Sequence, residues 1–467
     1  MENNKERAQW ASKIGFILAA AGSAVGLGNI WKFPGKAFAG GGGAYLIIYL
    51  LIVLLIGVPV MVTELSIGRF TRKNTIGSFR TLDKRFGWVG WFGVVCAFVI
   101  LCYYSHVGGW VLSYIVSYIT EGSTVMADGL GYFYGFLGID AATGATWFPT
   151  RAIIFAFIFV AINTFILLKG VSGGIEKFNK VGMPALFVIL IILLVRANTL
   201  PGAAEGIKYM FSCDWSKINS GTFISALGQA FFSLSLGMAI MITYGSYLKK
   251  EENISKNSFI ICGLDTLVAF LAGFIIVPAV FATLGSEGIG KGGGFAFASL
   301  AGVFKAMPAG ALFGVLFYLL LLFAALSSSI SIQEGIVAFC CEEWGWKRNK
   351  TIIFMSIVCF AIGIIYTISQ ASVNITIPWL DFTGVSHPIA GDWMEFLTDR
   401  LLLPVCAFGE CIFVGWIWGP KHVQEEVCQN DAKFAWFKVY NFLIKYICPI
   451  AIAVIIIYSF ATGTTVS

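Results

Sequence analysis

The chain has 467 residues, of which 58% are hydrophobic and only 12% charged, and its mean hydropathy is +0.83. This composition excludes a soluble globular protein and indicates an integral membrane protein with little mass outside the lipid bilayer. The formal net charge of +6 does not indicate nucleic-acid binding, because most Lys and Arg residues fall in loops expected on one side of the membrane.

Apolar runs long enough to cross a bilayer predict eleven helices, which we call spans 1 to 11. In chain order, their expected cores are 14 to 36, 44 to 68, 88 to 119, 150 to 168, 175 to 195, 223 to 247, 258 to 283, 309 to 340, 351 to 369, 393 to 419 and 436 to 460.

The basic loops predict the orientation of the chain. The loop after span 2 carries Arg69, Arg72, Lys73 and Arg80, and the positive-inside rule places it in the cytoplasm. The N-terminus is then expected in the cytoplasm and the C-terminus outside the cell, in a multi-pass protein of the plasma (inner) membrane. The first apolar run has no small-residue cleavage site after it, so no signal peptide is expected.

Span 1 contains an unusual segment at 22–34, which reads G-S-A-V-G-L-G-N-I-W-K-F-P. Three glycines, a serine and an asparagine weaken a helix at membrane depth, where free backbone groups are tolerated only beside a cavity or ligand. Span 6 contains a second such segment at 228–239, G-Q-A-F-F-S-L-S-L-G-M-A. Two broken helices, one in each half of the chain, indicate the binding site of a transporter.

The positions of the breaks also predict an internal repeat. Residues 12–196 and 222–419 each hold five spans and begin with a broken one, so the second set runs through the membrane in the opposite direction. We therefore expect an all-α polytopic fold with a 5+5 inverted repeat, discontinuous spans 1 and 6, and an additional span 11 at 436–460. Residues 1–467 form one membrane domain.

Two acidic residues inside apolar spans are candidate functional groups. Asp265 lies in span 7 and Glu64 near the end of span 2, and an ionisable group at such depth is a functional hypothesis by default. A neutral Asp265 that bonds to a neighbouring helix is the alternative. The hydroxyls at 327–329 in span 8 have two interpretations as well, because small residues also let membrane helices pack closely.

Other functional classes fit the sequence less well. A channel needs a continuous polar pore, whereas the polar residues here gather at one depth. An enzyme needs a catalytic cluster, but His106, His387 and His422 are scattered and neither G-x-S-x-G nor H-E-x-x-H occurs. The glycines at 40–43 lack the Lys-Ser/Thr of a phosphate-binding loop. We expect no enzymatic activity.

Five segments together resemble the sodium-coupled neurotransmitter and amino-acid symporter family, in particular its bacterial branch. They are the two broken segments, V-P-V-M-V-T-E-L-S-I-G-R in span 2, Tyr103-Tyr104 in span 3 and A-A-L-S-S-S-I-S in span 8. The resemblance implies sodium-driven import of hydrophobic or aromatic L-amino acids by alternating access. A non-transporting amino-acid sensor on the same fold and a symporter for another small carboxylated substrate are the alternatives. The sequence leaves the oligomeric state open.

The resemblance also implies a set of site residues. The first sodium ion would be bound by Ala24, Asn29, Ser233, Asp265 and the substrate carboxylate. The second would be bound by Gly22, Val25, Ala324, Ser327 and Ser328. The substrate pocket would consist of Ser23, Ala24, Leu27, Gly28, Ile100, Tyr104, Phe232, Ser233, Ser235, Met238, Ser328 and Ile332.

Chloride is not expected. Relatives have Asn at the position of Asp265, and chloride-dependent members have Ser at the position of Ala269, so the carboxylate of Asp265 would replace the anion. Amine transporters have Asp at the position of Gly26, so this chain needs a substrate that brings its own carboxylate. Phe232 and Met238 would be ordinary packing residues if span 6 were not broken.

The resemblance assigns the remaining residues to gates and to structural roles. The outer gate would pair Lys32 with Glu395. The inner gate would consist of Arg7, Trp10, Ser246, Tyr247 and Glu342. Glu64 would accept backbone N–H groups freed in span 6. The segment from Gly174 to Pro184 in span 5 would unwind to hydrate the second sodium, or would simply begin a helix at a Gly-Gly turn.

Overall fold

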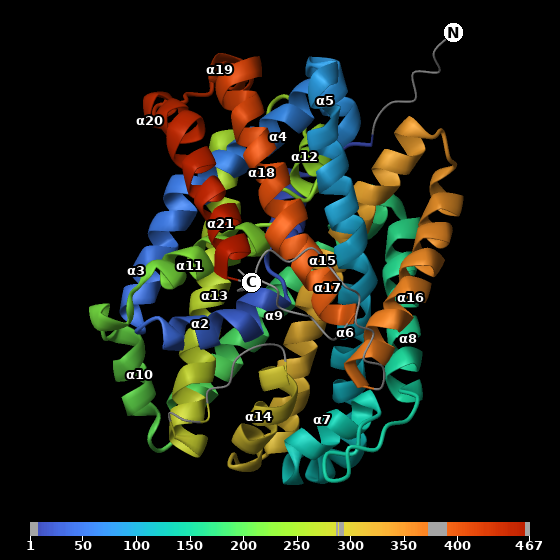
Figure 1. The fold of residues 1–467 in the computed structure, drawn as a ribbon, viewed down its shortest axis with the longest axis vertical. Coiled ribbons are helices and arrows are strands. Elements are labelled where there is room, and N and C mark those ends of the chain that lie inside the picture. The colour runs from blue at the N-terminus through green and yellow to red at the C-terminus, as the bar shows by residue number, and fades with distance from the viewer. Residues whose placement is uncertain (1–7, 286–287, 289–293, 372–389, 463–467) are drawn as a thin grey trace.

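The computed structural model describes residues 8–285, 288, 294–371 and 390–462, and these residues form helices and two isolated β-bridges (Figure 1). Nine continuous helical segments in this part are long and apolar enough to cross a membrane. They are Gly43–Thr71, Lys84–Ala127, Thr150–Leu168, Val171–Asn198, Ile254–Leu284, Gly310–Glu343, Arg348–Gln370, Trp393–Trp418 and Phe437–Tyr458.

The two other expected spans are discontinuous. Span 1 consists of α1 (Lys13–Ala24) and a second segment, Gly28–Ala39, and the two are bent by 53°. Span 6 consists of α11 (Ser220–Ser233) and α12 (Ile240–Ser246), with residues 234–239 non-helical between them. The all-helical class and the breaks in spans 1 and 6 are confirmed, whereas the boundaries of the inverted repeat stay a prediction.

Several spans contain changes in helix type. Span 2 joins α3 (Gly43–Ile52) to α4 (Val58–Thr71) through a π-helical turn, and span 5 begins with a π-helical turn at Val171–Glu176 before α9 (Lys177–Asn198). Span 10 contains α17, two π-helical turns and α18 within residues 390–418. The remaining spans are α6 (Gly87–Ala127), α8 (Thr150–Leu168), α13 (Ile254–Leu284), α15 (Gly310–Glu343), α16 (Arg348–Ala371) and, in span 11, α20 (Phe437–Phe442) with α21 (Cys448–Thr462).

Span 3 is longer than the expected core of 88 to 119. Helix α6 continues to Ala127 across a non-helical residue, Glu121. Arg151 at the start of span 4 donates to Glu121 Oε1 over 2.8 Å, and the hydroxyl of Tyr132 donates to the same oxygen over 2.6 Å. These polar partners stabilise an extension that the apolar pattern alone did not indicate.

Short helices lie at the two ends of the bundle. The helices α7 (Gly129–Leu137), α10 (Ala203–Phe211) and α14 (Gly294–Lys305) gather at the end opposite the N-terminus (Figure 1). The helices α5 (Thr75–Leu82) and α19 (Pro420–Val427) lie at the N-terminal end. Helix α2 (Phe33–Ala39), in the second half of span 1, contacts helix α11, the first half of span 6, so these two halves meet midway along the bundle.

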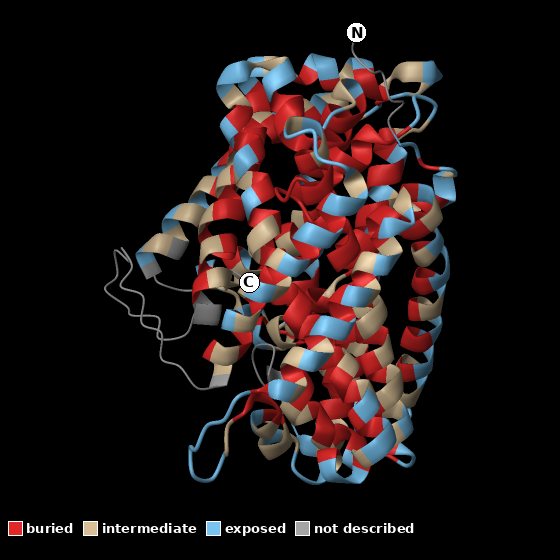
Figure 2. Ribbon diagram, turned by 90° about the vertical axis from the view of Figure 1, so that its right-hand side faces the viewer, coloured by how far each residue is buried: buried red, intermediate tan, exposed pale blue. Residues whose placement is uncertain are grey.

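The burial pattern fits a bundle in lipid. Buried residues follow the middle of the bundle, and exposed positions lie on its outside (Figure 2). Large apolar side chains are common among the exposed ones, including Phe157, Val181 and Ile457, as expected where helices face acyl chains. The buried polar groups include Glu64 and Asp265, both 0% exposed, which therefore need partners within the protein.

Candidate functional site

The break in span 1 exposes backbone groups that neutral side chains satisfy. Helix α1 ends at Ala24, and Val25 has an extended conformation. The N–H of Gly26 then donates to Asn29 Oδ1 over 3.1 Å, and the N–H of Leu27 donates to the hydroxyl of Tyr104 over 3.3 Å. The residues after the break thus present the N-terminal end of a helical segment, which favours negative charge.

The break in span 6 has a different construction. Ser235, Gly237 and Ala239 all have left-handed backbone conformations, with φ of 54°, 70° and 65°. The N–H of Gly237 donates to Oε1 of Glu64 over 2.8 Å. Glu64 is fully buried, so this acceptor from span 2 holds the non-helical segment in place.

A small cavity lies between the two breaks. It has a volume of about 20 Å³ and is lined by Gly26, Asn29 and eleven of the twelve residues implied for the substrate pocket. The eleven are Ser23, Ala24, Gly28, Ile100, Tyr104, Phe232, Ser233, Ser235, Met238, Ser328 and Ile332. The twelfth, Leu27, lines a larger cavity that adjoins the small one. Because about 20 Å³ accommodates roughly one water, an amino acid needs Met238 or other lining side chains to move.

The lack of a side chain at Gly26 opens the centre of this cavity. A Cβ atom at Gly26 would lie 3.2 Å from Ser328 Oγ and 3.4 Å from the hydroxyl of Tyr104. Any longer side chain would therefore project between these two hydroxyls.

A buried carboxylate lies directly beside the break in span 1. Ser233 Oγ lies 2.8 Å from both carboxylate oxygens of Asp265, and Asn29 Nδ2 lies 2.7 Å from Oδ1. Asp265 makes no ion pair among the described residues, so neutral groups surround its charge. Oxygen atoms around an unbalanced carboxylate are a donor set that suits a hard cation such as sodium.

The residues implied for the second sodium lie where α1 and α15 pack together. Ser328 Oγ donates to the carbonyl of Ser23 over 3.1 Å and lies 3.5 Å from the carbonyl of Val25. Ser327 Oγ lies 3.1 Å from the carbonyl of Ala324. Gly22 faces Ser327, since a Cβ atom there would lie 3.2 Å from Ser327 Cβ. These oxygens also fit a hard cation.

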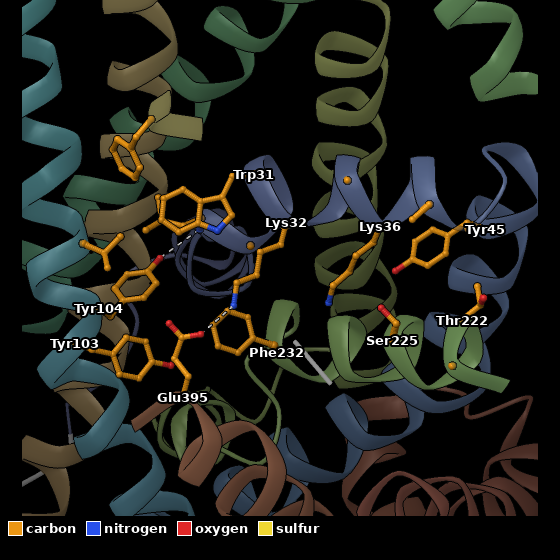
Figure 3. A pocket seen from close by; sticks show the side chains of 18 of the residues that line it. Trp31, Lys32, Lys36, Tyr45, Tyr103, Tyr104, Thr222, Ser225, Phe232 and Glu395 are labelled. Carbon is orange, nitrogen blue, oxygen red and sulfur yellow. Dashed lines mark hydrogen bonds and ion pairs between the residues drawn. The ribbon is translucent and has the colours of Figure 1, made fainter. Parts of the chain in front are cut away.

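A cavity of about 840 Å³, which we call the vestibule (Figure 3), adjoins the small cavity, and both are lined by Gly28, Tyr104 and Phe232. Lys32 Nζ lies 3.9 Å from Glu395 Oε2 and 5.4 Å from the centre of the Phe232 ring. Lys36 Nζ donates to Gln229 Oε1 over 3.0 Å, and Gln229 Nε2 donates to the carbonyl of Gly28 over 3.3 Å. The structure thus brings the implied outer-gate pair together.

The opposite side of the site is closed by what we call the N-terminal mouth, built from Trp10, Tyr244, Tyr247, Glu334 and Arg348. Trp10 Nε1 donates to the carbonyl of Tyr244 over 3.1 Å, and its backbone N–H donates to the carbonyl of Tyr247 over 3.3 Å. The hydroxyl of Tyr247 donates to Glu334 Oε1, and Arg348 binds both carboxylate oxygens of Glu334.

Three other residues were implied for this inner gate. Ser246 Oγ donates to the carbonyl of Thr243 over 2.5 Å, and Glu342 accepts from the backbone N–H of Asn74 over 2.7 Å. Arg7 lies outside the described residues. Glu334 and Arg348 were not anticipated, although a glutamate inside the apolar run of span 8 is a recognisable signal.

Sequence reasoning missed three other polar residues around the site. Ser331 Oγ lies 2.7 Å from Ser23 Oγ beneath the small cavity. Glu176 Oε2 accepts from the N–H of Ala11, and its Oε1 accepts from Ser12 Oγ, each over 2.8 Å. Asn179 lies one turn later in the same span. Both Glu176 and Asn179 fall between Gly174 and Pro184, and their spacing of three residues places them on one helix face.

The profile of the "Sodium:neurotransmitter symporter family" matches residues 7–124 and 138–466 of the chain. The chain belongs to this family. The resemblance inferred from its motifs is therefore confirmed, and so is a sodium-dependent transporter with many membrane-spanning helices.

Similar proteins come from bacteria and animals. A Haemophilus influenzae protein named "Uncharacterized sodium-dependent transporter" is 37% identical over 97% of this chain and 98% of its own length. A Bacillus subtilis protein with a similar name is 34% identical over 96% of both chains. A Drosophila melanogaster protein named "Sodium-dependent nutrient amino acid transporter 1" is 26% identical over 98% of this chain and 78% of its own.

A solved structure shares the fold. The crystal structure of MhsT in complex with L-phenylalanine superposes with a TM-score of 0.84 at 36% sequence identity. The match covers 97% of this chain and 99% of MhsT. The all-helical polytopic fold with two discontinuous spans is therefore that of a known amino-acid-binding member of the family.

Proposed function

We propose that the protein is a secondary active symporter that imports hydrophobic or aromatic L-amino acids with sodium across the plasma membrane. In this proposal its N-terminus lies in the cytoplasm, its C-terminus lies outside, and the vestibule opens to the exterior. The observation that carries the proposal is Asp265, a fully buried carboxylate with neutral partners beside the broken span 1. Such a carboxylate favours a bound cation at that point.

The substrate class follows from the walls of the small cavity. Ile100, Met238 and Ile332 supply apolar surface, and the Tyr104 hydroxyl faces the break in span 1. A substrate carboxylate at that break would interact with backbone N–H groups and complete the shell of the first sodium. Because residue 26 is glycine, no side-chain carboxylate takes that role. The complex of MhsT with L-phenylalanine supports an amino acid of similar character.

The proposal assigns the two ions to the two oxygen sets described above. The first sodium belongs to Ala24, Asn29, Ser233 and Asp265, and the second to Gly22, Val25, Ala324, Ser327 and Ser328. Asp265 supplies the negative charge that chloride provides in other members, so transport should not require chloride. In the transport cycle, the Lys32–Glu395 pair closes the vestibule and the N-terminal mouth then opens.

The deciding experiment is uptake into proteoliposomes of the purified full chain. An inward sodium gradient should drive accumulation of labelled L-phenylalanine, L-tryptophan or L-leucine, and a potassium or choline gradient should not. Equal uptake in chloride and gluconate would support the role of Asp265. Amines without a carboxylate should not compete.

Counterflow separates transport from sensing. Vesicles loaded with unlabelled amino acid should take up labelled amino acid in the presence of sodium. Sodium-dependent binding without counterflow would identify a sensor instead, and binding that is equal in sodium and potassium would refute the proposal as a whole.

A further inference from the structure

An asparagine in span 5 has a buried oxygen atom that the fold does not use. Asn179 is 0% exposed, and its Nδ2 donates to the carbonyl of Ile175 over 2.9 Å. Because a carbonyl only accepts hydrogen bonds, this contact fixes which end of the amide is the nitrogen. Oδ1 therefore points the other way, and it has no hydrogen-bond partner among the described residues. An unpaired buried amide oxygen costs roughly 1–3 kcal/mol.

The oxygen points at the junction of three spans. A Cβ atom at Gly22 would lie 2.2 Å from Asn179 Oδ1 and 3.2 Å from Ser327 Cβ. Asn179 Oδ1 thus occupies the place where residue 22 would carry a side chain, which explains the glycine there without any special backbone conformation. Helices α1, α9 and α15 pack against one another at this point. The oxygen lies beside two residues of the proposed second sodium set.

Local hydrogen bonding accounts for only one of the two polar atoms of the Asn179 amide. Asparagine in a helix often bonds to the carbonyl four residues earlier, and Asn179 does so through its nitrogen. That contact leaves the oxygen desolvated next to Gly22. It is one of several buried polar atoms without a hydrogen-bond partner among the described residues, and it lies beside Gly22 and Ser327.

The same turn of span 5 holds the start of α1. Glu176 accepts hydrogen bonds from Ala11 and Ser12, and its carboxylate fills the space next to Gly15. The residues before it form a π-helical turn, and Pro184 removes a backbone donor further on. The segment 175–179 therefore contacts both ends of α1, so unwinding it would withdraw Asn179 and release the N-terminal mouth together.

We propose that Asn179 Oδ1 is a further oxygen ligand of the second sodium, reaching the ion directly or through one water from span 5. This inference rests on the proposed sodium symport. Asn179 Oδ1 completes a shell of six oxygens, of which the other five come from Gly22, Val25, Ala324, Ser327 and Ser328. Hard cations such as Ca²⁺ take roughly six to eight oxygen ligands. Unwinding of span 5, which the family resemblance implies, would withdraw this ligand from the ion.

The test measures sodium itself on the purified full chain. Binding of radioactive sodium is titrated at equilibrium, and its dissociation rate is measured after dilution. Asn179→Leu keeps the shape of the side chain and removes the oxygen, so it should weaken sodium binding about three- to tenfold and speed release similarly. Asn179→Asp adds a negative charge near the ion and should strengthen binding and slow release.

The matched control is Asn163→Leu. Asn163 is also a buried asparagine with an unpaired Oδ1 among the described residues, but it lies in span 4, and its Nδ2 donates to Gln333 over 2.6 Å. This variant should bind and release sodium as the wild type does. If Asn179→Leu also behaves like the wild type, Asn179 is not a ligand. If that variant does not fold, unchanged sodium binding in Asn179→Asp overturns the inference equally.

The outcomes separate this inference from the proposed function. A wild-type chain that binds no sodium refutes sodium symport. A wild-type chain that binds sodium, with Asn179 variants that bind it equally well, refutes only the role of Asn179.

Discussion

The two helix breaks of this molecule are built in opposite ways. In span 1 the free N–H groups of Gly26 and Leu27 meet a neutral amide and a phenol. In span 6 the free N–H of Gly237 meets a carboxyl oxygen of Glu64, a fully buried side chain from span 2. Asn29 and Tyr104 line the small cavity and can exchange their partners for a ligand, whereas the hydrogen bond of the fully buried Glu64 lies in a site of low dielectric and is held firmly.

The backbone conformations agree with this contrast. The break in span 1 uses an extended residue, Val25, and the break in span 6 uses left-handed residues, two of which, Ser235 and Ala239, are not glycine. Left-handed conformations of residues with a side chain persist only where the surroundings impose them. We infer that the break in span 1 responds to ligands and that the break in span 6 is a fixed scaffold opposite it.

The largest expected effect comes from replacing Glu64, which holds the break in span 6. Glu64→Ala leaves the N–H of Gly237 buried and unpaired, so sodium-dependent binding of L-phenylalanine should fall about a hundredfold or more. Glu64→Gln keeps an oxygen acceptor and should retain more binding than the Ala variant. The measurement is equilibrium binding on protein that elutes normally from size-exclusion chromatography. Equal losses in the two variants would mean that the carboxyl group itself, and not an oxygen acceptor for the N–H of Gly237, is what matters.

The next effect concerns the ligand-responsive break. Asp265→Asn removes the buried charge that balances the first sodium, so sodium should become at least about tenfold less potent in supporting substrate binding. Adding Ala269→Ser to that variant should restore part of the binding when chloride is present. Sodium titrations in chloride and in gluconate measure both effects.

Ala269→Ser alone is the control, and it should show no chloride dependence because Asp265 still supplies the charge. A wild-type chain that needs chloride would contradict this view of span 7.

The contrast between the breaks also separates what the sequence could predict from what it could not. The sequence predicts both breaks, because helix propensity is local. The signals are the glycines at 22, 26 and 28 and the mixed segment at 228–239. The contact of Glu64 with the N–H of Gly237 was expected only through the family resemblance. The contacts of Gln229 with Gly28 and of Glu176 with Ala11 join residues far apart in the chain. No local pattern contains that information, since it depends on how the spans pack.

A smaller effect on substrate affinity is expected from Tyr104, whose hydroxyl faces the break in span 1. Tyr104→Phe removes the acceptor of the Leu27 N–H and one polar wall of the small cavity. Substrate affinity should fall about five- to tenfold with little change in stability. Tyr103→Phe is the matched control, because Tyr103 lines the vestibule instead, and its effect should stay below about twofold. Saturation binding with labelled L-phenylalanine compares the two, and equal losses would show that Tyr104 has no special role at the break.

The smallest expected effect is on the free energy of unfolding, and it concerns the backbone strain at Ala239 in span 6. Ala239 has φ of 65°, a conformation that costs an alanine roughly 1–2 kcal/mol and a glycine almost nothing. Ala239→Gly loses a buried methyl group but relieves that cost, so the free energy of unfolding should change by less than about 0.5 kcal/mol.

Ala21→Gly is the matched control, because Ala21 is equally buried but lies inside α1. There glycine loses the same methyl group and weakens a regular helix, so the variant should be less stable by about 1–2 kcal/mol. Thermal unfolding in one detergent compares the pair. Equal destabilisation at the two positions would show that Ala239 is not strained and that the break in span 6 owes its rigidity to Glu64 alone.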